Sequence, residues 1–576
     1  MSLFMSPYRC CLFSLIRRWM RMAAIVSTTA MLILVQPGHT VYGLGVAGDS
    51  FFSITKSINL LGEVYRQVSQ NYVDSIDVSE FMYSGIDGML RQLDPYTAFL
   101  DEAQSDELEE ITSGQYAGIG ITIGIISGDL FITSVIEGQP AAKAGLQIGD
   151  QILSVNGVKV SRKSLDEVRG SIKGAAGTTI RLTIRKDNRG ALKRYTLTRG
   201  EVRVSTVPYA GIFGASGYVQ MNTFGEHSKD ELSSAIRMIR DQAANDRIGL
   251  NGIVLDLRGN PGGLLTSAVD VASLFVEKGS RVVSTRGRTA ESEQVYVTRT
   301  EPQVPSLPLV IMIDADSASA SEIVAGAMQE LDRGVILGGG SFGKGLVQSI
   351  INLPYDYILK LTTAKYYTPS GRLIQKPLFP EATDRRVVLS DVAGDSTQVF
   401  YTRNRRKVYG GGGIRPDISV KADSLSEYQH VLEKEGLLFR YASRFHLKHP
   451  AYHLQQLSSE PLYDDFSHFL RKERFSFRSE AQKKLDSLKV IIRKDEAGYG
   501  QELAGALESL DKALAARKNR SISRDSIRVT AALQREILRH YDERASLRRS
   551  IEEDPVAAKA FALLVDQKRY RAMLMP

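Results

Sequence analysis

The spacing of hydrophobic residues changes along the chain and divides it into regions with different expected structure. Residues 51–100 carry apolar side chains at helical spacing, and this pattern ends before Pro95. From about 105 to 200, short strand-like runs alternate with glycine- and proline-containing turns, which predicts a small β-rich domain. From about 205 to 375, strand and helix patterns alternate, which indicates a parallel or mixed sheet covered by helices.

The pattern is clear enough to predict individual elements in the two central regions. In the β-rich region we expect strands over Ile119–Ile126, Leu130–Ile136, Gln151–Val155, Thr179–Ile184 and Leu192–Leu197, with short helices near Pro140–Ala144 and Ser164–Ile172. In the α/β region we expect strands over Gly217–Met221, Gly252–Leu257, Leu309–Ile313 and Val335–Leu337, and helices over Lys229–Ala244, Leu264–Val276 and Ser321–Leu331.

The last quarter of the chain reads as charged amphipathic helices. Its final helix has a clear start signal in Asp554 followed by Pro555. Residues 515–528 are basic, and we interpret them as an exposed linker or helix end. The domain organisation predicted from these patterns is 1–45 signal peptide or N-terminal anchor, 50–104 helical segment, 105–200 β-rich domain, 201–422 α/β core and 423–576 helical C-terminal extension.

The N-terminus has the features of an export signal. Arg17, Arg18 and Arg21 precede the uncharged, mostly apolar run Met22–Val35, which is short for a membrane span. An uncleaved anchor is the alternative, and both place the body of the protein outside the cytoplasm. The chain's two cysteines lie in this region, so a processed protein has no disulfide, thiol nucleophile or Cys-ligated metal.

The net charge of +8 indicates neither nucleic acid nor a membrane surface as a partner, because Lys and Arg are mixed with Asp and Glu along most of the chain.

A serine follows the expected strand Leu309–Ile313 at the start of a helix. Ser319 therefore lies at the carboxyl edge of the sheet, where α/β proteins place their sites, and the free N–H groups of the helix start can bind an oxyanion. Its neighbours Ala318 and Ala320 are small. The alternative is structural, since Ser319 and Glu322 have the spacing of a capping box.

A lysine follows the next expected strand in a glycine-rich loop. Because both strands end at the same edge of the sheet, Lys344 can reach the neighbourhood of Ser319. A lysine acts as a base when burial keeps it neutral. An exposed loop lysine is the alternative, and the loop lacks the spacing of a phosphate-binding P-loop.

A third strand ends in the turn Asp256–Leu264, which contains Gly262 and Gly263. Its free N–H groups are candidates for the second oxyanion donor. Alternatively, the two glycines serve only the turn's backbone conformation.

Together these segments resemble the tail-specific, or carboxyl-terminal processing, serine proteases. The similar motifs stand here as Asp256–Gly263, Ser317–Glu322 and Gly339–Gln348. The resemblance implies a crotonase-like α/β protease core, with Ser319 as nucleophile, Lys344 as general base and Gln348 orienting the lysine. It further implies oxyanion donors at the N–H groups of Ala320 and the Gly262/Gly263 turn, with Gly263 favoured. Asp94-Pro95-Tyr96-Thr97 resembles a further element of the family, with Tyr96 in place of histidine.

The β-rich region resembles a PDZ domain. Gly118, Ile119, Gly120 and Ile121 stand where such domains bind the terminal carboxylate of a peptide. The resemblance implies an endopeptidase that recognises exposed apolar C-termini of unfolded or tagged envelope proteins. It is expected in the periplasm or cell envelope, with inner-membrane anchoring as an alternative to release. An adaptor protein and a homodimer are further candidate partners. Lys173 replaces the arginine usual in the family after the last PDZ helix, which leaves the gating of such an enzyme open.

Several other functions are alternatives for this sequence. A non-catalytic PDZ scaffold, or a latent protease that depends on an adaptor, is the main alternative. A trypsin-like enzyme is disfavoured because only His227 lies in the α/β core, and an acyl-CoA enzyme because it fits neither an export signal nor a PDZ domain. We expect no cofactor and no metal, since metallopeptidase motifs such as H-E-x-x-H are missing from the sequence.

Overall fold

The computed structural model describes residues 45–160, 164–186, 190, 192–376, 398–421, 425–450, 460–493 and 501–576. Residues 1–44 of the predicted signal or anchor, and the predicted boundary at 422/423, lie outside the described residues. The chain divides into two compact units, residues 1–86 and 87–576, which are taken separately below. None of the helices in the described ranges is long and apolar enough to cross a membrane.

The first unit is helical, as predicted for this part of the chain. It contains α2 (Gly45–Asn71) and most of α3 (Val78–Leu90). The two helices are joined by stacking of the Tyr65 and Phe81 rings, 5.7 Å apart, and by a hydrogen bond from the Tyr65 hydroxyl to the Val78 carbonyl (2.7 Å).

The second unit is built around a six-stranded sheet. Its order is β10-β11-β12-β15-β16-β21, in which only the β10–β11 pair is antiparallel. The strands are β10 (Tyr209–Phe213), β11 (Ser216–Gln220), β12 (Gly252–Asp256), β15 (Leu309–Ile313), β16 (Val335–Gly338) and β21 (Ile418–Ser419). The four predicted strands of this region are therefore confirmed, and the carboxyl ends of β12, β15 and β16 meet at one edge because these strands pair in parallel.

The central strands are continuously apolar because both faces of the sheet are covered. On β15, Ile311 and Ile313 pack with the helices α7 (Ser228–Asn245), α8 (Leu265–Ala272) and α9 (Ala320–Glu330). The alternate residues Val310 and Met312 face a second cluster. That second cluster is supplied by the end of the chain.

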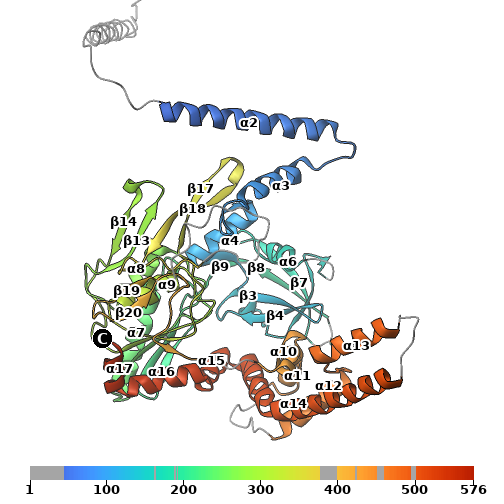
Figure 1. The fold of residues 1–576 in the computed structure, drawn as a ribbon. Coiled ribbons are helices and arrows are strands. Elements are labelled where there is room, and N and C mark those ends of the chain that lie inside the picture. The colour runs from blue at the N-terminus through green and yellow to red at the C-terminus, as the bar shows by residue number, and fades with distance from the viewer. Residues whose placement is uncertain are drawn as a thin grey trace, which may run out of the picture. The chain divides into compact units, whose positions relative to one another are not determined.

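The last helices complete the core instead of forming a separate extension. They are α15 (Glu543–Glu552), α16 (Pro555–Val565) and α17 (Gln567–Met573), and α16 contacts β12, β15 and β16 (Figure 1). The Tyr570 hydroxyl accepts a hydrogen bond from the Leu309 N–H (2.9 Å) in the buried layer. The predicted start of α16 is confirmed, since the Asp554 side chain accepts from the Val556 N–H and Pro555 is the first helical residue.

A second sheet, which the pattern analysis did not predict, lies in the same unit. It has the order β1-β18-β13-β14, and β17 also pairs with β18. Its strands are β1 (Ala98–Leu100), β13 (Arg281–Gly287), β14 (Gln294–Val297), β17 (Leu346–Asn352) and β18 (Ile358–Tyr367). Because β1 pairs with β18, this sheet places residues 94–97, which precede β1, beside the strands β17 and β18, which follow Lys344.

The β-rich domain forms a sheet of order β3-β4-β5-β7-β8, with β6 (Val158–Lys159) beside β5. The strands are β3 (Ile121–Ile126), β4 (Asp129–Val135), β5 (Gln151–Val155), β7 (Thr179–Arg185) and β8 (Leu192–Thr198). The helices are α5 (Pro140–Lys143) and α6 (Leu165–Ile172), and α4 (Glu102–Ser113) precedes the domain. A separate antiparallel pair, β2 (Gln115–Gly118) with β9 (Gly200–Arg203), joins the first and last segments of the domain. All five predicted strands are confirmed.

Between the boundary near 423 and α15 the chain forms a helical bundle. Its helices are α10 (Glu427–Lys434), α11 (Leu437–Lys448), α12 (Glu460–Lys472), α13 (Glu480–Arg493) and α14 (Gln501–Tyr541). The interpretation of residues 515–528 as a linker or helix end is wrong, because they lie inside the 41-residue helix α14. One face of that helix is anchored in the bundle core through Val529, Leu533 and Ile537, which extends regular structure through the basic stretch.

Candidate active site

The turn between β15 and α9 holds Ser319 in an uncommon backbone conformation. We call residues 314–321 the Ser319 turn. Ser319 has φ 54° and ψ −113°, a positive φ that residues other than glycine rarely adopt. Such a conformation persists only where the surroundings hold it, and it is concentrated at functional sites.

Hydrogen bonding separates Ser319 from the serines on either side. The Ser317 and Ser321 hydroxyls are buried and donate to the carbonyl oxygens of Leu257 (2.8 Å) and Asn260 (2.9 Å). The half-buried Ser319 side chain lies at the N-cap of α9 in a capping box with Glu322, and within the described ranges its hydroxyl donates to no group. The middle serine is therefore the one available to a substrate.

Two backbone N–H groups beside Ser319 are unused. The turn after β12, residues 257–264, is here called the Gly263 turn. Within the described chain, neither the Ala320 N–H nor the Gly263 N–H has a hydrogen-bond acceptor, whereas the Gly262 N–H donates to Asn260 Oδ1 (2.9 Å). The two predicted donors, Gly263 and Ala320, are thus free to bind an oxyanion, and Gly262 is not.

The Gly263 turn approaches the Ser319 turn at backbone contact. A Cβ added to Gly262 would lie 2.8 Å from the Ser319 Cβ, and one added to Gly263 would lie 2.2 Å from the Phe224 carbonyl oxygen. Both glycines also have positive φ, 103° and 145°. Only glycine fits at either position, because a side chain would collide with the neighbouring backbone and because the positive φ disfavours other residues.

The loop after β16, residues 339–345 and here called the Lys344 loop, carries a lysine with altered acidity. Burial lowers the pKa of Lys344 to about 8, the charge of Lys360 acts in the same direction, and Asp94 and Glu322 oppose them. The Lys344 ammonium lies over the Tyr96 ring, 4.6 Å from its centroid, and no hydrogen bond within the described chain joins Nζ to the Ser319 hydroxyl. Burial therefore makes Lys344 easier to deprotonate than an exposed lysine.

Glu322 joins the two loops. Its Oε1 accepts from the Ser341 hydroxyl (2.5 Å) and the Gly343 N–H (2.7 Å), and its Oε2 accepts from the N–H groups of Ser319 and Lys344 (both 2.9 Å). Burial raises the pKa of this carboxyl, which is fully enclosed, while the four donors act in the opposite direction. The capping-box spacing indicated the bond to Ser319, but it did not reveal the three bonds to the Lys344 loop.

Two tyrosines complete the surroundings of Lys344. The buried Tyr366 hydroxyl donates to the Lys344 carbonyl (2.5 Å) and lies 3.2 Å from the Ser319 carbonyl. Tyr96 is held by its own turn, in which Asp94 Oδ1 accepts from the N–H groups of Tyr96 and Thr97. The sequence singled out Tyr96 only as a departure from a motif, and its position over Lys344 gives it a physical role.

Within the described chain the Gln348 side chain forms no hydrogen bond with Lys344. Its amide donates to the Thr362 hydroxyl (3.3 Å) on β18, and the Thr362 N–H donates to Thr97 Oγ1 (3.2 Å). The expectation that Gln348 orients the lysine stays a prediction.

The predicted carboxylate-binding loop lies between β2 and β3. Gly118 ends β2, Ile121 begins β3, and the N–H groups of Ile119 and Gly120 have no acceptor among the described residues. Gly120 has φ 76°, and a Cβ there would lie 2.4 Å from the Gln139 Cβ. β3 is an edge strand of its sheet and α6 contacts it, which is the arrangement that accepts a peptide as an added strand.

No metal site is evident in the part of the chain that the structure describes, where no three or more His, Cys, Asp or Glu side chains gather to hold an ion.

Three segments of the chain match known families. Residues 215–382 match peptidase family S41, residues 131–186 match the PDZ domain, and residues 428–564 match the C-terminal helical domain of a probable PDZ-protease. The last match covers a region for which the sequence analysis found no resemblance. The PDZ match begins after the loop Gly118–Ile121.

Individual relatives agree with these matches. A carboxy-terminal-processing protease of Bartonella bacilliformis is 38% identical over 320 residues, which is 56% of this chain and 73% of that protein. The carboxy-terminal processing protease CtpB of Bacillus subtilis is 31% identical over 326 residues, 56% of this chain and 66% of its own. Among solved structures, a photosystem II D1 C-terminal processing protease is 26% identical and covers 62% of this chain and 92% of its own, with a TM-score of 0.33. The chain therefore belongs to peptidase family S41, among the carboxy-terminal processing proteases, and is a serine-type peptidase with a PDZ domain.

Proposed function

We propose that this chain is an endopeptidase in which Ser319 attacks the peptide carbonyl carbon and Lys344 acts as the general base. Neutral Lys344 takes the proton from the Ser319 hydroxyl as the Oγ–C bond forms. The N–H groups of Ala320 and Gly263 bind the resulting oxyanion. Lys344 then gives its proton to the leaving amine, the C–N bond breaks, and water later hydrolyses the acyl-enzyme.

The observation that carries this proposal is the environment of Lys344. A lysine whose pKa is lowered to about 8 is partly neutral near neutral pH, and its loop is tied to the Ser319 turn by the Glu322 carboxylate. Because no hydrogen bond joins Nζ to the Ser319 hydroxyl within the described chain, the mechanism requires the Lys344 side chain to rotate until Nζ comes within hydrogen-bond reach of that hydroxyl. Gln348 is proposed to orient the lysine in the rotated state.

We further propose that substrates are unfolded or tagged polypeptides whose exposed apolar C-termini bind the PDZ domain. The two unused N–H groups of the Gly118–Ile121 loop and the open edge of β3 support this. The N-terminal apolar run supports a location in the periplasm or cell envelope, after export or with retention at the inner membrane.

The test is cleavage of an unfolded protein with an apolar C-terminal tail by the wild type, Ser319→Ala and Lys344→Ala. We expect the wild type to cut in the presence of chelators, and both variants to lose activity by at least about a thousandfold. Ser317→Ala and Lys365→Ala are the matched controls, because they lie close by but have no proposed chemical role. If Ser319→Ala or Lys344→Ala cuts as fast as the wild type, the mechanism is wrong.

Within the described chain no hydrogen bond joins Lys344 Nζ to the Ser319 hydroxyl, and this gives the latent-protease alternative a specific basis. If the folded wild type does not cut the tailed substrate, this alternative replaces the proposal. Restored cleavage on adding a partner protein would identify an adaptor.

A further inference from the structure

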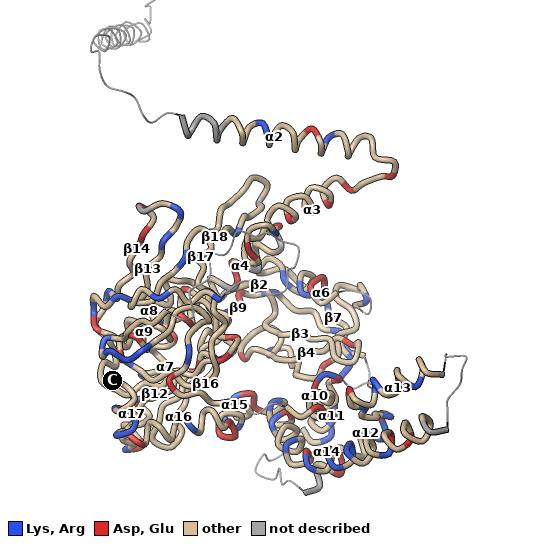
Figure 2. Tube along the Cα trace, in the orientation of Figure 1, with Lys and Arg blue, Asp and Glu red and all other residues tan. Residues whose placement is uncertain are grey.

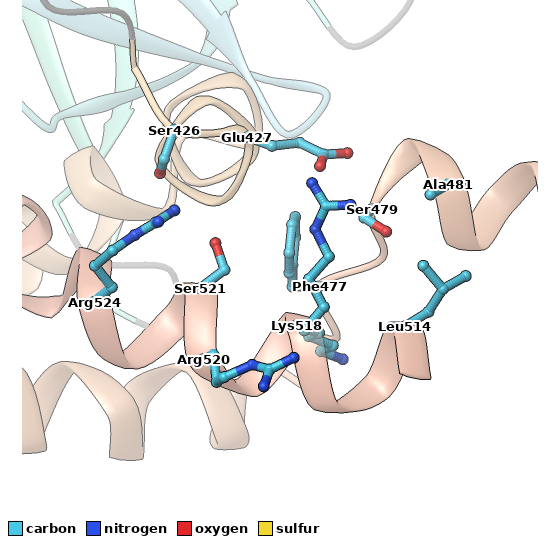
Figure 3. Close-up of a pocket in the computed structure, with 11 residues that line it drawn as sticks. Ser426, Glu427, Phe477, Ser479, Ala481, Leu514, Lys518, Arg520, Ser521 and Arg524 are labelled. Atoms are coloured by element: carbon cyan, nitrogen blue, oxygen red, sulfur yellow. The ribbon is translucent and has the colours of Figure 1, made fainter. Parts of the chain in front are cut away.

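A cavity in the C-terminal helical bundle lies among α10, α13 and α14, away from the residues discussed so far. It has a volume of about 630 Å³, within the range that ligand-binding pockets occupy. Its apolar lining consists of Phe477, Ala481 and Leu514, and its cationic lining comes from four side chains of α14: Arg517, Lys518, Arg520 and Arg524. Figure 3 shows Ser521 and Arg524 projecting from α14 toward Ser426 at the start of α10.

The cationic side chains are concentrated and unbalanced. From Lys512 to Arg524 every charged residue of α14 is Lys or Arg. Figure 2 shows the Lys and Arg positions of α14 in blue. Within the described part of the chain, Arg517, Lys518 and Arg520 form no salt bridge, and Arg524 has only a contact of 3.9 Å with Asp525. By contrast, Lys512, which does not line the cavity, is paired with Glu508 at 2.7 Å.

Two acidic groups near the cavity offset only part of this charge. Glu427 lines it, but its carboxylate accepts a hydrogen bond from the backbone N–H of Glu480. Asp525 is buried and accepts from the Ser521 hydroxyl (3.3 Å). Arg517, Arg520 and Arg524 are exposed, so the cavity is open to solvent, and cations gathered around it attract an anionic ligand.

The starts of two helices add to the positive potential. Ser426 accepts from the Gln429 N–H (3.1 Å) as the cap of α10, and Ser479 accepts from the Gln482 N–H (3.2 Å) at the start of α13. Both serines line the cavity, so both helix N-termini adjoin it. Helix N-termini favour anions, and here they supplement the four side chains.

We propose that this cavity binds a phosphate-bearing ligand. Four cations against one carboxylate exceed what a single carboxylate ligand neutralises, and they suit the greater charge of a phosphate group. Arginine forks match phosphate oxygens with paired N–H donors. The small apolar lining then contacts the organic part of the ligand. A cavity of about 630 Å³ suits a compact group better than an extended acidic peptide. The ligand is either the headgroup of an anionic phospholipid or a soluble phosphate ester.

The test measures binding of pyrophosphate to the purified full chain by calorimetry. The cavity variant carries Lys518→Gln with Arg524→Gln. Its matched control carries Lys512→Gln with Arg528→Gln, which removes the same charges from the same helix outside the cavity. We expect the cavity variant to bind on the order of a hundredfold more weakly and the control to bind like the wild type. Thermal unfolding of all three proteins checks that each is folded.

A second arm separates the two sources of phosphate. Cosedimentation with phosphatidylglycerol vesicles, compared with phosphatidylcholine vesicles, is measured for the same three proteins. Loss of the preference for phosphatidylglycerol in the cavity variant alone identifies a lipid headgroup, and pyrophosphate binding without that preference identifies a soluble ester. The proposal is overturned if the folded wild type binds neither probe, if both variants bind alike, or if only an acidic peptide binds.

Discussion

The Ser319 turn and the Lys344 loop both follow parallel strands of one sheet, but they are held in place differently. The Ser319 turn is attached at several points, through the Ser317 and Ser321 hydroxyls and the Ala318 N–H, to carbonyl groups of the Gly263 turn. In the Lys344 loop, three donors converge on the single carboxylate of Glu322.

This difference separates two ways of positioning reactive groups. The Ser319 turn has redundant support, so the loss of one bond leaves others in place. The Lys344 loop has further supports, such as the bonds from the Tyr366 hydroxyl to the Lys344 carbonyl and from the Phe342 N–H to the Ser317 carbonyl. Three of its donors nevertheless share one side chain, that of Glu322, which also accepts from the Ser319 N–H. We therefore expect the distance between Ser319 and Lys344 to change more when Glu322 is altered than when the Ser317 or Ser321 hydroxyl is removed.

The largest effect is expected from Glu322→Gln. A carboxamide supplies one acceptor oxygen where the carboxylate supplies two, so two of the four donors lose their acceptor. A small displacement of Lys344 then lowers kcat on the order of a hundredfold, while KM for the tailed substrate stays near the wild-type value. Steady-state kinetics and a pH profile measure the change, and the profile distinguishes a displaced base from a merely less stable protein.

Glu330→Gln is the matched control for this variant. Glu330 is on the same helix α9 and equally enclosed, but it pairs with Arg372 (2.8 Å) and accepts from the Ser370 N–H (2.7 Å). We expect Glu330→Gln to lower the free energy of unfolding and to leave kcat of the folded enzyme nearly unchanged. Equal losses of kcat in both variants would show that Glu322 has no special role in positioning Lys344.

The next largest effect is expected in the pH dependence of kcat/KM, which the protonation of Lys344 determines. Because the neutral amine is the base, kcat/KM should rise with pH and level off above about 8, the pKa of Lys344. Lys360→Gln removes a repelling charge, so the pKa of Lys344 rises and the profile moves to higher pH. Asp94→Asn removes an attracting charge, so the pKa falls and the profile moves to lower pH. Shifts of both profiles in one direction would contradict this assignment of the base.

Local patterns predicted the elements that present the site. The strands β12, β15 and β16 and the turns after them were recognisable because each is a short apolar run followed by glycine or small residues. Parallel pairing then placed the three turns at one edge without further information. The same reasoning marked Gly263 and Ala320, whose N–H groups the structure leaves unused.

The features that sequence reasoning missed depend on contacts between distant segments. Nothing near Leu564 in the sequence indicates that α16 covers β12, β15 and β16. Likewise, Tyr96 and Lys344 meet because β1 pairs with β18, a long-range pairing without a local signal. The helix through 515–528 was missed because a run of cations looks like a solvated linker unless its anchored face is known.

The smallest effect is expected from removing one of the redundant supports of the Ser319 turn. Ser321→Ala deletes the hydroxyl that donates to the Asn260 carbonyl, but that oxygen still accepts from the Ala318 N–H (3.1 Å). The free energy of unfolding should therefore fall by about 1 kcal/mol, as for one ordinary hydrogen bond, with only a slight change in kcat. Chemical denaturation and steady-state kinetics on the same preparation measure both. A loss of kcat as large as that of Glu322→Gln would mean that the Ser319 turn is no more robust than the Lys344 loop, and the contrast between them would fail.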